Sequence, residues 1–341
     1  MLFIGALINS CGSGGAGSSG TSYGGPGSAY TATFTPGNGF SIEKRTTVGG
    51  SVDFTVAGTY VTLSSGFLKL TVDSVTGSGG PTVGAQAYGL QIPGFAFLLK
   101  PFDSGEIIPM VALNDCPTSD LSLNWIVTDY DGGSSLISGA DLFGTFSYTY
   151  ATNSPSIPTR YDLGYNSLGA GTSLTIDTCS GGVVTIDGGA GNMWLTQGGG
   201  ALVRTAGGTI VATKSAYYNP ANIVKTFTGI LFDQSQSGAN QTQPLSITFN
   251  STSSGTGAVY TDVENGVVST TDVATISVSS HNSPSNGFFK TTVTTAAGSN
   301  PMLCQVSANA GGSGKTMLFC VGVSPGDGTN TKLYNMIGIS Q

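Results

Sequence analysis

Charged side chains are scarce in this chain of 341 residues, where Asp, Glu, Lys and Arg together make up 9%. An ordinary soluble protein has roughly 25%, so the composition is not that of a typical cytosolic enzyme. Apolar residues still make up 39% of the chain and recur in short runs, which excludes a disordered chain. Solubility must rest on Ser, Thr, Asn and the 53 glycines, and such a surface suits an extracellular setting.

Basic residues are few and do not cluster. There are 11 Lys and Arg against 18 Asp and Glu, giving a net charge of −7, and the largest basic cluster is Lys44-Arg45. Nucleic acids and anionic lipid surfaces are bound through clustered cations. The sequence therefore argues against a nucleic-acid partner and against electrostatic docking on a membrane.

Histidine is almost absent. His281 is the single one, so any Ser-His-Asp or Cys-His mechanism would have to use it, and a metal site of several histidines is excluded. His281 lies in the polar segment 279–284, which favours a solvated loop over a catalytic position. We predict no cofactor.

Three motif matches fail in their context. Residues 309–316 come within one residue of the phosphate-binding loop pattern, but Asn309 replaces its first glycine, and the residues after Lys315 read as a strand where the mechanism needs a helix. This segment is better interpreted as a hairpin turn. Residues 20–24 match a nucleophile elbow and residues 15–20 a dinucleotide loop, but neither follows a strand, and we assign them no function.

Carboxylate chemistry is harder to exclude, because it needs only two acids about 5–10 Å apart. Asp129 and Asp131 share one face of an extended segment, but the further ligands of a calcium loop are missing. A structural turn is the favoured interpretation, so we predict neither a catalytic nor a metal-binding residue. A solvated loop is the default for the densest acidic stretch, which contains Asp103, Glu106, Asp115 and Asp120.

From Tyr30 onward, short apolar or alternating runs are separated by Gly, Pro, Asn and Asp at intervals of about 8–12 residues, a pattern typical of sandwiches and barrels. The runs 51–56, 60–63 and 67–72 alternate with period two, so each can bury one face. We find no convincing long helix. The predicted fold class is all-β, with antiparallel barrel or sandwich domains and short hairpin connections, meander barrels being the first choice.

The chain divides into four predicted parts. Residues 1–10 resemble a signal peptide, 11–29 form a Gly/Ser-rich tether, 30–220 a β domain and 221–341 a second β domain. The boundary is placed within 216–225, where Asn219-Pro220 provides a turn signal. No fixed-period repeat supports a propeller or solenoid.

Four cysteines besides Cys11 form an even set. A hairpin centred at Gly312 places Cys304 opposite Cys320, within disulfide reach on neighbouring strands. By exclusion, Cys116 pairs with Cys179. The alternative is four independent buried thiols, since free cysteine is itself a common core residue.

Aromatic residues give the positive hint of a binding surface. Sugar rings stack on exposed aromatic faces, although packing in the core explains most of these residues equally well. The candidate glycan contacts are Trp194, Tyr148, Tyr150, Tyr217 and Tyr218.

An apolar run over residues 2–8 is followed by a cysteine and a glycine-rich segment. The run is too short to span a bilayer, which takes about 20 apolar residues, but its length fits the core of a signal peptide. Leu7-Ile8-Asn9-Ser10-Cys11 resembles the lipobox of bacterial lipoproteins, although no Lys or Arg precedes it. The resemblance implies that Cys11 carries a lipid and becomes the mature N-terminus, and that Gly12 directs the protein to an outer membrane.

Together these features predict an exported, lipid-anchored surface protein with a non-catalytic structural, adhesive or binding role. Its partners would be the membrane, through the lipid, and a surface glycan or protein. Two alternatives stay open. A secreted glycan-acting hydrolase would show a cleft with two facing acids, and a barrel that binds a small apolar ligand would show an internal cavity.

Overall fold

The computed structural model describes residues 21–25, 30–47, 50–101, 107–113, 116–130, 135–171, 175–186, 191–195, 200–205, 208–215, 218–280 and 287–341. These residues form antiparallel strands and short 3₁₀ helices, with no α-helix among them. The predicted all-β class is confirmed. The 3₁₀ helices are η1 (Tyr150–Thr152), η3 (Pro220–Ile223), η4 (Gly238–Gln241) and η5 (Ala310–Gly312).

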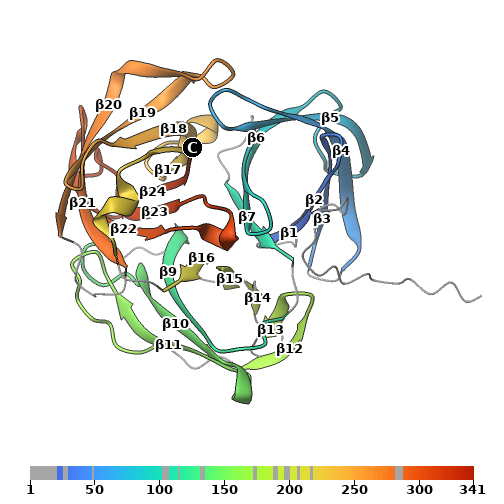
Figure 1. The fold of residues 1–341 in the computed structure, drawn as a ribbon, viewed down its shortest axis with the longest axis horizontal. Coiled ribbons are helices and arrows are strands. Elements are labelled where there is room, and N and C mark those ends of the chain that lie inside the picture. The colour runs from blue at the N-terminus through green and yellow to red at the C-terminus, as the bar shows by residue number, and fades with distance from the viewer. Residues whose placement is uncertain are drawn as a thin grey trace, which may run out of the picture.

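The first eight strands close into a barrel, at the upper right of Figure 1. Each strand pairs with the next, and β1 closes the barrel on β8 through the pairs Tyr23 with Ala112 and Gly24 with Val111. The strands are β1 (Thr21–Gly25), β2 (Tyr30–Thr35), β3 (Gly39–Arg45), β4 (Val52–Thr62), β5 (Leu68–Gly77), β6 (Gln86–Ile92), β7 (Ala96–Pro101) and β8 (Ile108–Ala112).

The next eight strands form one antiparallel sheet, at the bottom of Figure 1, in the order β11-β10-β9-β16-β15-β14-β13-β12. The pairing of β9 with β16 places the first and last strands of this segment side by side in the interior of the sheet. The strands are β9 (Leu121–Tyr130), β10 (Phe143–Thr149), β11 (Ser154–Tyr161), β12 (Ile176–Ser180), β13 (Val183–Ile186), β14 (Gly191–Leu195), β15 (Gly200–Thr205) and β16 (Gly208–Lys214).

The last eight strands close into a second barrel, at the upper left of Figure 1. It closes through β17 and β24, which pair from Phe227 with Ser340 to Asp233 with Tyr334. The strands are β17 (Thr226–Asp233), β18 (Thr242–Phe249), β19 (Ser254–Asp262), β20 (Val267–Ser280), β21 (Phe288–Thr295), β22 (Gly298–Ser307), β23 (Met317–Val323) and β24 (Leu333–Ser340).

The predicted boundary at 216–225 falls between β16 and β17. The segment expected to form one first domain contains a barrel and a separate sheet. The division into two domains stays a prediction. Another detail differs from expectation, because the runs 51–56 and 60–63 fall, except for their outermost residues 51 and 63, in the single strand β4. The residues between them form a bulge at Ala57 and Gly58 rather than a turn.

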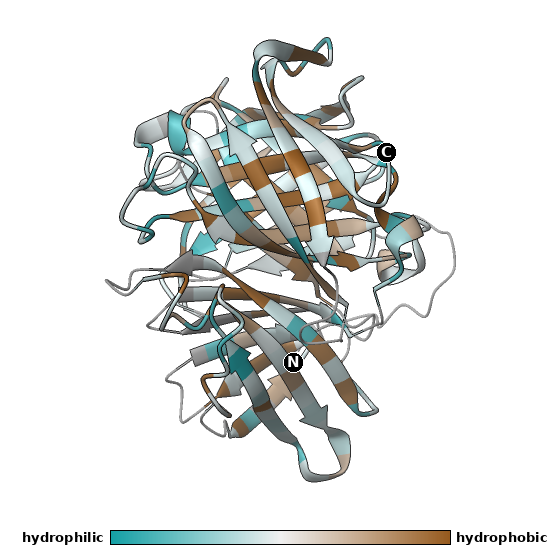
Figure 2. Ribbon diagram, turned by 90° about the vertical axis from the view of Figure 1, so that its left-hand side faces the viewer, coloured by the Kyte–Doolittle hydropathy of each residue, from teal (hydrophilic) through white to brown (hydrophobic). Residues whose placement is uncertain are grey.

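Apolar side chains fill the interior of each barrel, as expected for eight strands. In the first barrel the ring centroid of Phe34 lies 4.8 Å from that of Phe97 and 6.0 Å from that of Tyr23. In the second, Phe227 and Phe289 are fully buried. Inward and outward positions alternate along each strand, and Figure 2 shows the resulting succession of apolar and polar residues.

A further apolar cluster lies outside both barrels and joins them to the sheet. It combines Phe67 of the first barrel, Trp125 and Phe143 of the sheet, and Phe288 of the second barrel. The ring centroids of Phe143 and Phe288 are 5.1 Å apart. Strands β7, β8, β23 and β24 are therefore buried on both faces over most of their length, whereas β5 buries one face as its alternation predicts.

Polar contacts join the same three units. Gln305 of the second barrel donates a hydrogen bond to Thr213 of the sheet. The hydroxyl of Thr228 donates to the carbonyl of Ser65, which belongs to the first barrel, over 2.6 Å. At the tip of the β19–β20 hairpin, Glu264 forms an ion pair with Lys69 of the first barrel. The two barrels and the sheet thus form one packed body.

Candidate functional site

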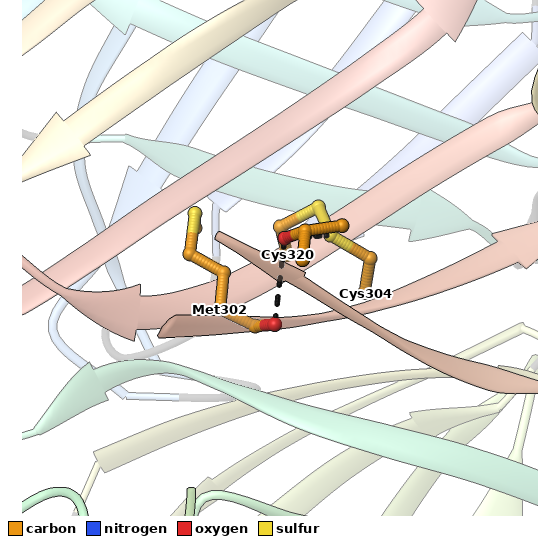
Figure 3. The surroundings of a disulfide bond; sticks show 4 residues. Met302, Cys304 and Cys320 are labelled. Atoms are coloured by element: carbon orange, nitrogen blue, oxygen red, sulfur yellow. Dashed lines mark hydrogen bonds between the residues drawn. A yellow bond between two sulfur atoms is a disulfide. The ribbon is translucent and has the colours of Figure 1, made fainter. Parts of the chain in front are cut away.

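Both predicted disulfides are present. Figure 3 shows the disulfide between Cys304 and Cys320, which lie opposite each other on β22 and β23. Their Cα atoms are 4.1 Å apart. Their side chains belong to the core inside the second barrel. The Cα atoms of Cys116 and Cys179 are 6.1 Å apart, and this bond ties the segment before β9 to the edge strand β12. The phosphate-loop-like segment 309–316 is the turn between β22 and β23, which confirms the hairpin interpretation.

Several other candidates lie outside the described residues. These are Cys11, which carries the predicted lipid, and Asp103, Glu106, Asp115, Asp131, Tyr217 and His281. Asp120 is described, and its carboxylate accepts a hydrogen bond from the backbone N–H of Tyr150 over 2.8 Å.

The described aromatic candidates do not share one surface. Trp194 on β14 and Tyr148 on β10 are 2% and 5% exposed, whereas Tyr150 is 50% exposed. Trp194 lies against the backbone of Gly24 in the first barrel. Tyr218 stacks on Phe289 with the ring centroids 4.6 Å apart, and burial raises its pKa to about 12. Glycan binding at these residues stays a prediction.

A cavity of about 290 Å³ opens at one end of the second barrel. Its lining comes from β17 to β21 and β24, and from the β17–β18, β21–β22 and β23–β24 connections. The opposite end of the barrel is closed by η3, whose Ile223 is fully buried in the barrel core. The volume is at the small end of the range for ligand pockets, about 300–1,000 Å³.

The inward-facing positions of the barrel change from apolar to polar at this cavity. On β17 Leu231 is followed by Asp233, and on β20 Asp272 precedes Ala274. Residues two apart on a strand share a face, so each pair occupies successive inward-facing positions of one strand. On β18, the polar Gln243 likewise lies two residues before the apolar Leu245. Polar groups therefore surround the opening above an apolar floor.

Tyr334 lies where the apolar floor of the cavity meets its polar rim. It is 7% exposed, lines the cavity, and pairs through its backbone with Asp233. Burial raises the pKa of Tyr334, and the charges of Asp233 and Asp272 raise it further. The phenol therefore stays protonated at neutral pH, with both carboxylates close enough to act on it.

Hydrogen bonds fix the rim on the side of Asp233. The Asp233 carboxylate accepts from the hydroxyl and the backbone N–H of Ser235, over 2.7 and 2.9 Å. The Ser324 hydroxyl donates to the Ser235 hydroxyl over 3.1 Å, and the Asn300 amide donates to the Ser324 carbonyl over 2.6 Å. The ends of β17, β22 and β23 are thus linked before any ligand arrives.

Asp327 organises the β23–β24 loop that completes the rim. Its carboxylate accepts the backbone N–H groups of Thr331 and Lys332, over 2.7 and 2.6 Å, and the hydroxyl of Thr329. Burial raises the pKa of Asp327, but these hydrogen bonds outweigh it and bring the pKa down to about 2. A carboxylate that stays ionised at neutral pH therefore holds the loop.

In the described part of the chain, no group of three or more His, Cys, Asp or Glu side chains is arranged to hold a metal ion. Among the same residues, no helix has the length and hydropathy needed to cross a membrane.

Comparison with known proteins assigns no family to the chain. No family model and no curated protein matches the sequence. Among solved structures the chain is similar to a vaccine-antigen mutant of transferrin binding protein B from Haemophilus parasuis Hp5, with 8% identity and a TM-score of 0.27. The match covers 94% of this chain and 66% of that protein. A TM-score this low carries no inference about fold or function.

Proposed function

We propose that this protein is a non-catalytic binding protein of the bacterial cell envelope, anchored by a lipid on Cys11, which takes a small ligand into the mouth of its second barrel. The observation that carries the binding role is the cavity, with its apolar floor and polar rim. The lipid anchor and the outer-membrane location rest on the lipobox-like N-terminus.

The architecture supports a pre-formed site rather than a loose surface groove. The floor is part of a closed barrel that a buried disulfide cross-links. The rim is held by Asp233, Ser235 and Ser324 on one side and by Asp327 on another. Small-molecule sites are usually concave, largely pre-formed and lined by apolar walls with a few placed polar groups.

Gly257 provides a direct test. It lines the cavity, and a Cβ atom built there would lie 3.8 Å from both Leu245 Cδ1 and Ile276 Cδ1, an ordinary contact distance. Gly257→Leu should therefore fill the cavity without unfolding the barrel. Thr256→Leu is the matched control, because neighbouring residues on β19 face opposite sides of the strand.

The measurement is a ligand-observed NMR screen of the full-length protein against a library of small amines, alcohols, carboxylic acids and sugars. We expect hits that bind the parent and the Thr256→Leu variant but not the Gly257→Leu variant. Each hit should also stay chemically unchanged during incubation. Hits that bind all three proteins alike would refute the cavity as the site, and turnover of a sugar would favour the hydrolase, whose two acids would be Asp233 and Asp272.

A further inference from the structure

We propose that the ligand of the second barrel is a small alkylammonium compound, whose charged group lies between Asp233 and Asp272 and whose hydrocarbon part lies on the apolar floor. This assignment rests on the proposed function of the cavity and adds the chemical class of the ligand. Three features of the lining support it.

The first feature is negative charge without a cationic side chain among the described residues of the lining. Asp233 and Asp272 both line the cavity, and none of the described residues that line it is Lys, Arg or His. The ion pairs of the described chain involve neither of the two carboxylates. Asp233 is half-buried and Asp272 is exposed, and two carboxylates at one opening attract a cation.

The second feature is Tyr334, which is 7% exposed and lines the same cavity. No hydrogen bond joins its hydroxyl to another described residue. The hydroxyl is not one of the fully buried atoms without a partner, so it reaches the cavity, where a ligand group can replace water as its partner. An ammonium group can donate a hydrogen bond to the phenol oxygen, and the ring face itself attracts cations.

The third feature is the apolar wall below the charges. Leu231, Leu245 and Val259 line the cavity together with Ala274. A bare metal ion would gain nothing from these side chains, and calcium needs six to eight oxygen ligands. A short alkyl chain attached to the ammonium group would cover the same surface and remove it from water. The combination therefore favours an organic cation.

The test compares three compounds of equal chain length: pentylamine, 1-pentanol and pentanoate. Binding is followed at pH 7 from backbone amide chemical shifts of the full-length protein, with Gly257→Leu as the blocked control. We expect pentylamine to bind at least about tenfold more tightly than 1-pentanol, and pentanoate to bind more weakly than either. Asp272→Asn and Asp233→Asn should each weaken pentylamine about fivefold and leave 1-pentanol unchanged.

Asp73→Asn is the control, because it removes a carboxylate from β5 of the first barrel. It should leave the binding of both pentylamine and 1-pentanol unchanged. Equal binding of all three compounds at the cavity would overturn the ammonium assignment while leaving the proposed function intact. Calcium chloride that shifts the same amides at lower concentration would assign the two acids to a metal. Tighter binding of Nα-acetyl-lysine amide would assign the site to a lysine side chain of a partner protein. Either result would overturn the inference.

Discussion

Replacing Cys304 and Cys320 together by alanine removes a cross-link between residues 16 apart in sequence. In the chain-entropy model a loop of this size stabilises the folded state by about 3 kcal/mol. The strands on either side remain paired, from Met302 with Gly322 to Ser307 with Met317. The loss should therefore arise mainly in the unfolded state, which becomes free to expand.

The assay is equilibrium unfolding in urea followed by circular dichroism. We expect the unfolding free energy to fall by about 3 kcal/mol and the denaturant slope m to rise, because the unfolded chain exposes more surface. At about 2 °C per kcal/mol for a large domain, the melting temperature should fall by about 6 °C.

The matched control replaces Cys116 and Cys179, which are 63 residues apart. The same model assigns this longer loop about 4 kcal/mol, so the control should lose more stability even though its disulfide lies nearer the surface. An unchanged free energy in the first variant, or a smaller loss in the second than in the first, would refute the chain-entropy reasoning.

Asp327→Asn should lower the unfolding free energy by about 1 kcal/mol at pH 7, a value discounted for solvent screening. The folded-state pKa of Asp327, about 2, lies below the ordinary 3.8. The difference in stability between parent and variant should therefore be complete above about pH 4 and vanish as denaturation is measured down to about pH 2. Phe143→Ala should lower the unfolding free energy by about 3–5 kcal/mol and lower the temperature of one common calorimetric transition. Separate transitions for the two barrels would contradict a shared core. Cys11→Ser should release the protein from membranes without unfolding it; fractionation and intact-mass analysis test this, and a variant that stays membrane-bound would remove the anchor.

Much of the fold could be predicted from local pattern. Alternating runs indicated strands, and the symmetry of residues 302–321 about Gly312 indicated a hairpin that pairs Cys304 with Cys320. The choice between barrel and sandwich depends on β1 meeting β8 and β17 meeting β24. Those pairs are far apart in the chain, and no local signal encodes them.

The candidate site was not predicted, for a related reason. Asp233, Asp272 and Tyr334 lie on three different strands, and only closure of the barrel brings them to one cavity. A weak signal existed, because each acid continues a period-two series of inward apolar residues. The same pattern also describes a strand that ends at the surface, so it cannot identify a site without the register.

The apolar cluster shared by the barrels and the sheet has a consequence for biosynthesis. The first barrel leaves the ribosome before the sheet and the second barrel exist, with the outward faces of Phe67, Leu98 and their neighbours still uncovered. Exposed apolar surface on an early intermediate is a hazard for aggregation. The order of synthesis therefore leaves a period in which this apolar surface is open to aggregation, until the sheet and the second barrel cover it.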